Sequence, residues 1–351
     1  MLSPRTGTIL RSIVGQYIVR ATPVASWSVT KACELGVCPA TIRNEMARLE
    51  EEGYISRPYP SAGSKPLDKG YRYYVDSITD IELPLTEQLL INHLFYQVEM
   101  EFEKWLSLSA TIIAKLAQNM AVVTKPKPAN SQFKHIELVT LEDSLALMVL
   151  VLHGARVKQQ LVTFDRIMTQ LELTAIASRL NAAYAGLTRP QILAKDGEPS
   201  PTEQALTNRL LEIMQAEDKQ KHDEPYLDGW HFMLNQPEFT HNHQVLALME
   251  LAEQRNLLNI ITPPGLSNHG LWVSIGKENK SEIIHEYSVV LGQFGLPEEA
   301  VGTIAVVGPT RMPYTRTISI ISYLSSVLST LVAELYGREI STRPTGHDVH
   351  Y

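Results

Sequence analysis

The chain has 351 residues, of which 44% are hydrophobic and 20% charged, a composition that excludes wholesale disorder and suffices for two or three domains. Its net charge of −7 is unevenly distributed: residues 1–75 contain 10 Lys and Arg against 6 Asp and Glu, a balance of +4, and the remainder has a balance of −11. The acidic total therefore does not exclude a nucleic acid as partner, because the N-terminal part can approach a polyanion.

The sequence also bears on where the protein resides. It has no stretch of about 18 uncharged apolar residues, and its N-terminus lacks the apolar run of a secretory signal. We therefore expect a soluble, cytoplasmic protein with no membrane partner. The two cysteines, Cys33 and Cys38, are too few for a disulfide framework or a four-ligand zinc site, so we expect them to be packing residues in a reducing compartment.

The first eighty residues have the pattern of short helices. Ser3 is a suitable N-cap for a helix over residues 4–19, a second helix is expected from Ser26 to Gly36, and a third begins at Pro39. The short interval between the second and third helices predicts a helix-turn-helix. The side chains expected to face the core of the first two helices are Ile9, Ile13, Tyr17, Val29, Ala32 and Cys33.

The third helix, residues 39–53, carries the most informative pattern. At 100° per residue, Ile42, Met46 and Leu49 cluster on one side, which predicts the buried face. Small residues on the opposite side would let the helix lie deep in a major groove, and the paired hydrogen-bonding atoms of Asn and Arg match adenine and guanine edges. The alternative is an ordinary solvated helix face. The residues of this opposite side are Ala40, Thr41, Arg43, Asn44, Ala47 and Arg48.

A basic loop follows this helix. Residues 54–57 suit a short strand, the prolines and glycine after them predict a loop, and Asp68 can cap a fourth helix over residues 69–78. Such a wing can hold phosphates or reach a minor groove, although an ordinary surface loop has the same composition. A helix-turn-helix followed directly by a basic two-stranded wing is more specific for DNA binding than either element alone. The cations of this region are Arg57, Lys65, Lys69 and Arg72.

The rest of the chain alternates helices and strands. Residues 85–121 predict one or two helices, and the polar stretch 188–225 resembles an insertion, with a helix of its own around residues 203–216. No internal repeat is visible. The expected strands are residues 135–140, 145–152 and 157–164, as an antiparallel meander, and 271–275, 287–291 and 302–307; the further helices are residues 172–185, 244–256 and 315–336.

Several motifs are similar to those of one family. The N-terminal ones are Pro23-Val24 with Ser26, Pro-Ala-Thr-Ile-Arg-Asn-Glu-Met at 39–46, Leu49-Glu50, Ser61-Ala62-Gly63 and Asp-Lys-Gly-Tyr-Arg-Tyr-Tyr-Val-Asp at 68–76. The later ones are Gln-Pro-Glu-Phe at 236–239, Ile-Gly-Lys-Glu-Asn at 275–279 and Val-Gly-Pro-Thr-Arg-Met-Pro-Tyr at 307–314. Over residues 4–337 the chain thus resembles the heat-inducible transcription repressor HrcA family.

The resemblance implies an α+β multidomain fold. It places an N-terminal winged helix-turn-helix at residues 1–80 and a GAF-like α/β core with an antiparallel sheet at residues 81–187 and 226–340. It also implies an inserted dimerisation domain, which we expect at residues 188–225, and we expect the tail, residues 341–351, to be disordered.

The resemblance further implies a negative regulator of the transcription of heat-shock (chaperone) operons. Such a protein binds an inverted-repeat operator in double-stranded DNA as a homodimer and releases it on heat stress, with the chaperonin as modulator. Carried onto this chain, the recognition-helix residues are Thr41, Arg43 and Asn44. Two departures stand out: Cys38 replaces the family's usual Ser before the helix, and Lys65 stands near the place of a wing Arg.

Other kinds of site are weaker. Residues 270–277 superficially resemble a phosphate-binding loop, but the glycine spacing is wrong and Glu278 replaces the needed Ser or Thr. His241 and His243, with His231 upstream, fit solvated histidines better than a metal site. We expect that the protein is not an enzyme and that it binds no cofactor or metal. We also expect Arg311 to lie in a structural turn and to bridge domains. The alternative function is a ligand-sensing transcription factor with a small-molecule site in the GAF-like core.

Overall fold

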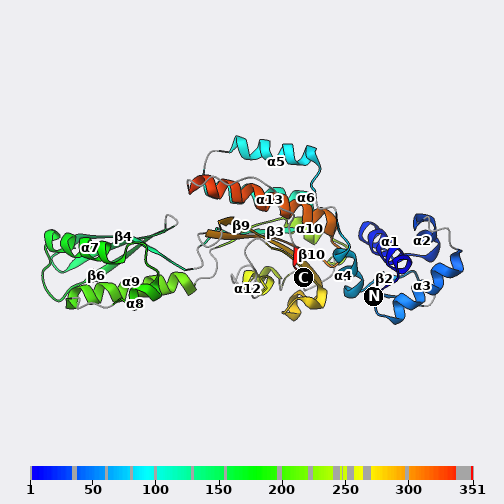
Figure 1. The fold of residues 1–351 in the computed structure, drawn as a ribbon, viewed down its shortest axis with the longest axis horizontal. Coiled ribbons are helices and arrows are strands. Elements are labelled where there is room, and N and C mark those ends of the chain that lie inside the picture. Colours follow the sequence, from blue (N-terminus) through cyan, green and yellow to red (C-terminus); the bar gives the residue numbers. More distant parts are fainter. Residues whose placement is uncertain are drawn as a thin grey trace. The chain divides into compact units, whose positions relative to one another are not determined.

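The structure is a computed structural model of the full chain, and it divides into two compact units. The first contains Met1–Lys125, Glu224–Gly295 and Gly302–Tyr351, and the second contains Pro126–Asp223 and Leu296–Val301. Both units mix helices with largely antiparallel sheets (Figure 1). The residues that the structure describes are 2–33, 38–59, 62–79, 82–98, 101–127, 130–153, 156–195, 200–219, 224–239, 246, 248–250, 257–263, 270–296, 300–336 and 349–350.

The N-terminal part, residues 4–76, is called the head below. Its elements are α1 (Pro4–Arg20), α2 (Ser26–Cys33), α3 (Pro39–Glu51), β1 (Ile55–Ser56), β2 (Lys65–Pro66) and α4 (Asp68–Asp76). The side chain of Ser3 caps α1 by accepting a hydrogen bond from the Thr6 amide at 3.2 Å, as the sequence predicts. The expected helix-turn-helix residues Ile42, Met46 and Leu49 are all buried, which confirms the inner face of α3.

Three side chains of the head, those of Ala32, Cys38 and Asp68, do not have the roles that the sequence predicts. Ala32 and Cys38 are exposed, so neither is a packing residue, and Cys33 is only half-buried. Asp68 does not cap α4, because its carboxylate instead accepts a hydrogen bond from the Lys277 amide at 3.0 Å. The expected helix end at Gly36 lies outside the described residues.

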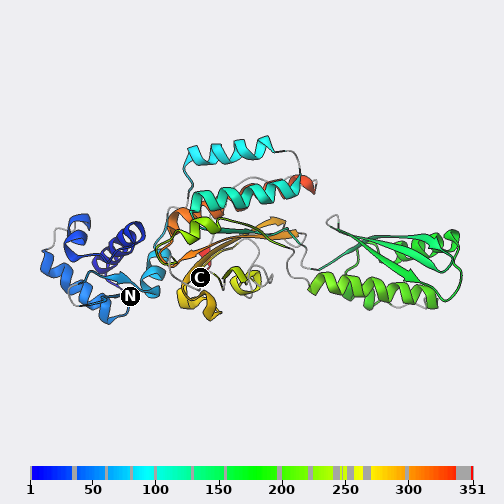
Figure 2. The same cartoon turned by 180° about the vertical axis from the view of Figure 1, so that it is seen from behind.

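A six-stranded sheet forms the centre of the first unit. Its strand order is β11-β8-β9-β10-β3-β7, with β8 and β9, β10 and β3, and β3 and β7 antiparallel. Nearly every residue of β9 and β10 is buried, because helices cover both faces of the sheet (Figure 2). The strands are β3 (Met120–Val123), β7 (Tyr226–Asp228), β8 (Leu271–Ile275), β9 (Tyr287–Leu296), β10 (Ala300–Pro309) and β11 (Val349–His350).

Two groups of helices cover this sheet. One face packs against short helices through a core that includes Met233, Leu257 and Leu291, whereas α5, α6 and α13 lie on the other side (Figure 1). Short 3-10 turns η1 and η2 follow β8. The bounds are α5 (Leu85–Gln97), α6 (Phe102–Ala117), α10 (Trp230–Leu234), α12 (Leu257–Ile261), η1 (Gly276–Glu278), η2 (Glu282–Ile284) and α13 (Tyr314–Leu335).

The strands at 271–275, 287–291 and 302–307 are confirmed, but β3 was not expected. The sequence predicts helix up to Ala121, whereas α6 ends at Ala117 because Gln118 takes a left-handed conformation with φ 52°. The expected tail disorder is wrong at Val349–His350, which pair in parallel with β8 at the edge of the sheet. Most of the expected helix 244–256 lies outside the described residues.

The second unit is a three-stranded meander covered on one face by helices. It contains β4 (Phe133–Glu142), β5 (Leu145–Leu152), β6 (Arg156–Thr163), α7 (Gln170–Tyr184), α8 (Arg189–Leu193) and α9 (Pro201–Lys219). Alternate residues of β5 are buried, together with residues of α7 and α9, in a single core. The meander is therefore confirmed, but the boundary expected at residue 188 falls inside this unit, because the strands and α9 share that core.

One described helix is long and apolar enough to cross a membrane by length and composition. This is α13, which the sequence predicts as a helix but not as a candidate span, because its apolar residues alternate with Ser and Thr. Half of its apolar 18-residue segment is buried inside the fold. Core helices of soluble proteins can have the same length and composition. The helix packs against α6 and the sheet, which accounts for its composition.

Candidate nucleic-acid interface

The outer face of α3 is open to solvent. Arg43 and Asn44 are exposed, and Thr41 is half-buried. The small side chains of Ala40 and Ala47 project little from the same face. Arg43 makes no ion pair with a residue that the structure describes. The sequence therefore placed Arg43 and Asn44 on the exposed face, and the Thr41 hydroxyl lies 3.2 Å from the Cys38 sulfur, within hydrogen-bond distance.

A buried carboxylate holds the inner side of α3 against α1. Glu45 accepts hydrogen bonds from the Arg5 guanidinium at 2.6 Å and from the Thr6 hydroxyl at 2.8 Å. The Thr6 and Arg5 hydrogen bonds lower the pKa of Glu45 below its ordinary value, although burial opposes them. This residue fixes the position of the outer face, and sequence reasoning missed it because one Glu in a polar helix carries no distinguishing signal.

The strands β1 and β2 form a short two-stranded ribbon that packs on the α1–α2 connection. Ile55 pairs with Pro66 and Ser56 with Lys65, and Val24 and Ser64 exchange two backbone hydrogen bonds of 2.9 and 2.8 Å. A side chain could not fit at Gly63, because a Cβ there would lie 2.6 Å from the carbonyl of Pro23. Lys65 is exposed on this ribbon.

Three other predicted cations have partners within the head. Arg48 pairs with Glu52 at 2.7 Å, and Arg57 pairs with Glu50 at 3.2 Å. The Lys69 ammonium donates to the Glu52 carbonyl at 2.8 Å and lies 4.2 Å from the centre of the Tyr54 ring. These cations border α3 and the β1–β2 ribbon, and Arg48 and Lys69 are exposed, so they remain able to meet a phosphate.

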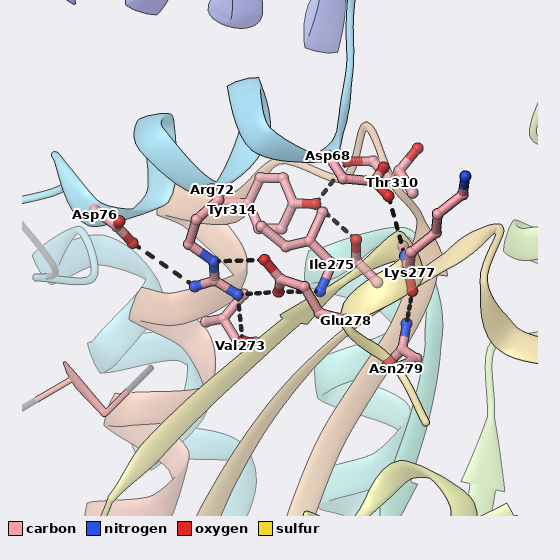
Figure 3. Close-up of polar contacts among 12 residues, drawn as sticks. Asp68, Arg72, Asp76, Val273, Ile275, Lys277, Glu278, Asn279, Thr310 and Tyr314 are labelled. Atoms are coloured by element: carbon pink, nitrogen blue, oxygen red, sulfur yellow. Dashed lines mark hydrogen bonds and ion pairs between the residues drawn. The ribbon is translucent and has the colours of Figure 1, made fainter. Parts of the chain in front are cut away.

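Arg72 differs from the other predicted site residues. Its guanidinium donates to Glu278 at 2.9 Å and to the Val273 carbonyl at 2.8 Å, and it lies 3.7 Å from Asp76 (Figure 3). Its side chain is only 19% exposed. The structure thus brings Arg72 together with the central sheet and not with the surface around Arg43. We leave it out of the interface proposed below.

Arg311, which follows β10, links the head to the segment after α10; the sequence predicts it as a bridge between domains, but both sides of this contact lie in one compact unit. It donates to the carbonyl of Ile18 in α1 at 3.2 Å and to the side chain of Gln236 at 2.6 Å, and it pairs with Glu238. Within the described part of the chain, no group of three His, Cys, Asp or Glu residues could hold a metal ion. His241 and His243 lie outside that part.

Comparisons with known proteins show which class of protein this chain resembles. Residues 103–318 match the family described as HrcA protein C terminal domain. The chain is 54% identical to a heat-inducible transcription repressor HrcA of Dehalococcoides mccartyi, over 96% of this chain and 98% of the relative. The protein named heat-inducible transcription repressor HrcA in Roseiflexus castenholzii is 40% identical, over 97% of each chain. Both relatives are named as repressors of transcription.

The chain belongs to the HrcA family of heat-inducible transcription repressors. A crystal structure described only as that of a hypothetical protein has a similar fold, with a TM-score of 0.58 and 22% sequence identity. It covers 95% of this chain and 98% of that one. The likeness therefore extends over both units.

Proposed function

We propose that this repressor reads an inverted-repeat operator ahead of chaperone operons through the outer face of α3, and that it does so as a dimer. The observation that carries the proposal is the set of exposed Arg43 and Asn44 side chains on a helix whose opposite face is buried. In this proposal the head is a winged helix, the central sheet is a GAF-like core, and the second unit is the inserted dimerisation domain. The protein acts in the cytoplasm, where its DNA lies.

Each part of the head has a role in this proposal. Arg43 and Asn44 contact base edges in the major groove, because their paired donors and acceptors match guanine and adenine, and Thr41 lies beside them. Lys65 on the ribbon contacts the neighbouring phosphates or minor groove. Arg48, Arg57 and Lys69 strengthen binding to any duplex, because phosphate contacts carry no sequence information directly.

The outer face of the three-stranded sheet supports a dimer. Helices cover one face only, and the other carries aliphatic side chains on all three strands, with Leu147 flanked by Val139 and Leu161. A soluble protein rarely leaves such an apolar surface open, so we propose that a second copy covers it. The residues of this apolar face are Val139, Leu141, Leu145, Leu147, Val149, Val151, Val157 and Leu161.

A dimer also explains specificity. One recognition helix contacts too few base pairs to select one site in a genome, and two helices related by a two-fold axis read two matching half-sites. Heat release then requires only a unimolecular change of a few kcal/mol in one connection of the molecule. We propose that the chaperonin favours the binding-competent form, so purified repressor should bind the operator more tightly when chaperonin is added.

The test of base reading is a mobility-shift titration with Arg43→Ala and Asn44→Ala. Both variants should lose the preference for operator over random duplex while keeping the wild-type unfolding temperature, because both side chains are exposed. Arg209→Ala is the matched control, since this exposed Arg lies in α9 of the second unit. Undiminished preference in both α3 variants would contradict the proposal.

The test of the dimer is Leu161→Glu, which places a charge on the apolar face. Sedimentation equilibrium should show monomers, because a carboxylate buried between two sheets is strongly unfavourable. Arg209→Glu is the control for adding a carboxylate elsewhere on the unit. A wild-type dimer that survives Leu161→Glu unchanged would show that another surface forms the dimer.

A further inference from the structure

Motifs that lie far apart in the sequence meet where the head contacts the central sheet. The α4 segment 68–76 contacts residues 273–278, and the end of α1 contacts Arg311, which also holds Gln236. We call this contact the joint. Both sides belong to the same compact unit.

The ion pair between Arg72 and Glu278 is at the centre of the joint (Figure 3). The guanidinium contacts both carboxylate oxygens, and Glu278 also accepts a hydrogen bond from the Ile275 amide at 2.9 Å. Burial alone would lower the pKa of Arg72, but the hydrogen bond and charge of Glu278 outweigh it and raise that pKa. Such two-pronged Arg–carboxylate contacts fix orientation as well as distance.

A close backbone approach adds a second contact. Asp68 accepts a hydrogen bond from the Lys277 amide, and its carboxylate lies where a side chain at residue 276 would be. Gly276 also has φ +54°, which favours glycine, so a Cβ there would be strained as well as 2.5 Å from Asp68. The joint therefore leaves no room for a side chain at residue 276.

Aromatic rings complete the joint beside these polar contacts. Tyr71 of α4 and Tyr314 of α13 are fully buried, with ring centroids 6.1 Å apart. The Tyr314 hydroxyl donates to the Thr310 carbonyl at 2.6 Å, next to Arg311. The head is therefore held by two arginines and a buried ring contact, and not by the covalent chain alone.

The joint leaves the outer face of α3 free. Arg43 and Asn44 are exposed in the same structure in which Arg72, Glu278 and Arg311 are engaged. The joined arrangement is thus compatible with DNA binding, and it does not block the head.

We infer that Arg72, Glu278 and Arg311 are positioning residues that fix the head on the sheet so that both heads of a dimer meet two half-sites at once. This inference rests on the proposed dimeric operator binding. A fixed head brings the second recognition helix to its half-site at a high effective concentration, whereas a loosened head must be ordered on each binding event. A single half-site has no such requirement. Opening the joint therefore lowers affinity for the inverted repeat and leaves half-site affinity unchanged.

The experiment compares two duplexes for each variant. The first is the inverted repeat that wild-type protein selects from a random-sequence pool, and the second holds only one of its halves. Arg72→Met removes the charged contact, Glu278→Gln keeps an acceptor for the Ile275 amide, and Gly276→Ala opens the joint without changing charge. Arg209→Met is the control, because it removes an exposed ion pair of the second unit.

We expect the ratio of full-site to half-site affinity to fall at least about tenfold in Arg72→Met and Gly276→Ala, less in Glu278→Gln, and not in Arg209→Met. A merely structural role would instead lower both affinities together through unfolded protein. A wild-type ratio retained by all three joint variants would overturn the inference, as would a wild-type protein without preference for the full site. If wild-type protein selects no sequence at all, the proposed function itself fails, which is a distinguishable result.

Discussion

The two faces of the head use the same residue type in opposite ways. On α3, Arg43 is exposed and makes no ion pair with a described residue, whereas on α4 Arg72 is largely buried and contacts Glu278 and Val273. Both arginines belong to one basic N-terminal region and look alike in sequence. A positive charge balance therefore identifies a region of the chain, but only packing separates arginines that remain open to a ligand from those that hold the fold.

Removal of the two arginines should also differ in its effect on stability. An exposed Arg without partners contributes little to stability, so its removal should change binding alone. Arg72 is largely buried, but its partner Glu278 is exposed, so water can solvate the carboxylate that is left when the guanidinium is removed, and the loss of stability should be modest. Removal of Arg43 should therefore affect base reading, whereas removal of Arg72 should weaken the joint and so lower the ratio of full-site to half-site affinity.

The largest stability effect is expected at Gly63, which supports the ribbon beside α3. Gly63→Ala should destabilise the head by about 1–3 kcal/mol, because its Cβ would meet the backbone of Pro23 and Val24 and the ribbon would have to shift. Thermal unfolding followed by circular dichroism measures the loss, and operator affinity should fall with it. Gly15→Ala is the matched control: nothing lies within 4 Å of its Cβ, and this helix-interior change should stabilise by about 0.5–1 kcal/mol. Equal effects of both would contradict the packing explanation.

Glu45→Gln tests how the inner side of α3 is held. The loss of the charged acceptor for Arg5 and Thr6 should cost about 1–2 kcal/mol at neutral pH. The pKa of Glu45 is lowered in the folded state, so its contribution is fully present above the unfolded pKa and disappears as pH falls through the folded pKa. The difference in unfolding free energy between wild type and variant, from urea titrations, should therefore shrink below about pH 4.5. A difference that stays constant down to pH 2 would show that charge is not its cause.

The sequence predicts much of the head because its signals are local. Apolar spacing placed Ile42, Met46 and Leu49 inside, whereas the turn expected before Pro39 lies outside the described residues. The role of Arg72 was not predictable, since its partner Glu278 lies 206 residues away and no local pattern encodes that distance. The strand β3 was missed because a four-residue apolar run after a helix reads as more helix.

The extent of the second unit was missed for a related reason. The polar composition of residues 188–225 suggested an insertion, but α9 within it packs against strands that begin at Phe133. The polar composition of this segment reflects the exposed side of α9. On the buried side, Leu206, Leu210 and Met214 belong to the core that α9 shares with the strands. A boundary drawn from surface composition therefore falls in the middle of a shared core.

Cys38→Ser is expected to stabilise the head slightly. Cys38 occupies the N-cap of α3 without making a side-chain cap hydrogen bond, and Ser at this position can accept one from the backbone. Thermal unfolding measures the gain. Cys33→Ser is the control, since Cys33 lies at the end of α2 and caps nothing. An equal gain in both variants would mean that replacing a thiol, and not capping, is responsible.

Arg48→Ala should have the smallest effect on stability, because its pair with Glu52 is exposed and spans one helical turn. Its effect on DNA binding distinguishes the edge of the α3 surface from its centre. If Arg48 meets a phosphate, the variant binds operator and random duplex equally less tightly, and the slope of log affinity against log salt concentration falls by about 1. Arg43→Ala should instead lose operator preference with a smaller change in slope, because a contact to a base edge releases no counterion. Fluorescence anisotropy titrations at several salt concentrations measure both quantities. Identical behaviour of the two variants would mean that α3 contacts only the DNA backbone, and the base-reading role would then pass to another part of the head.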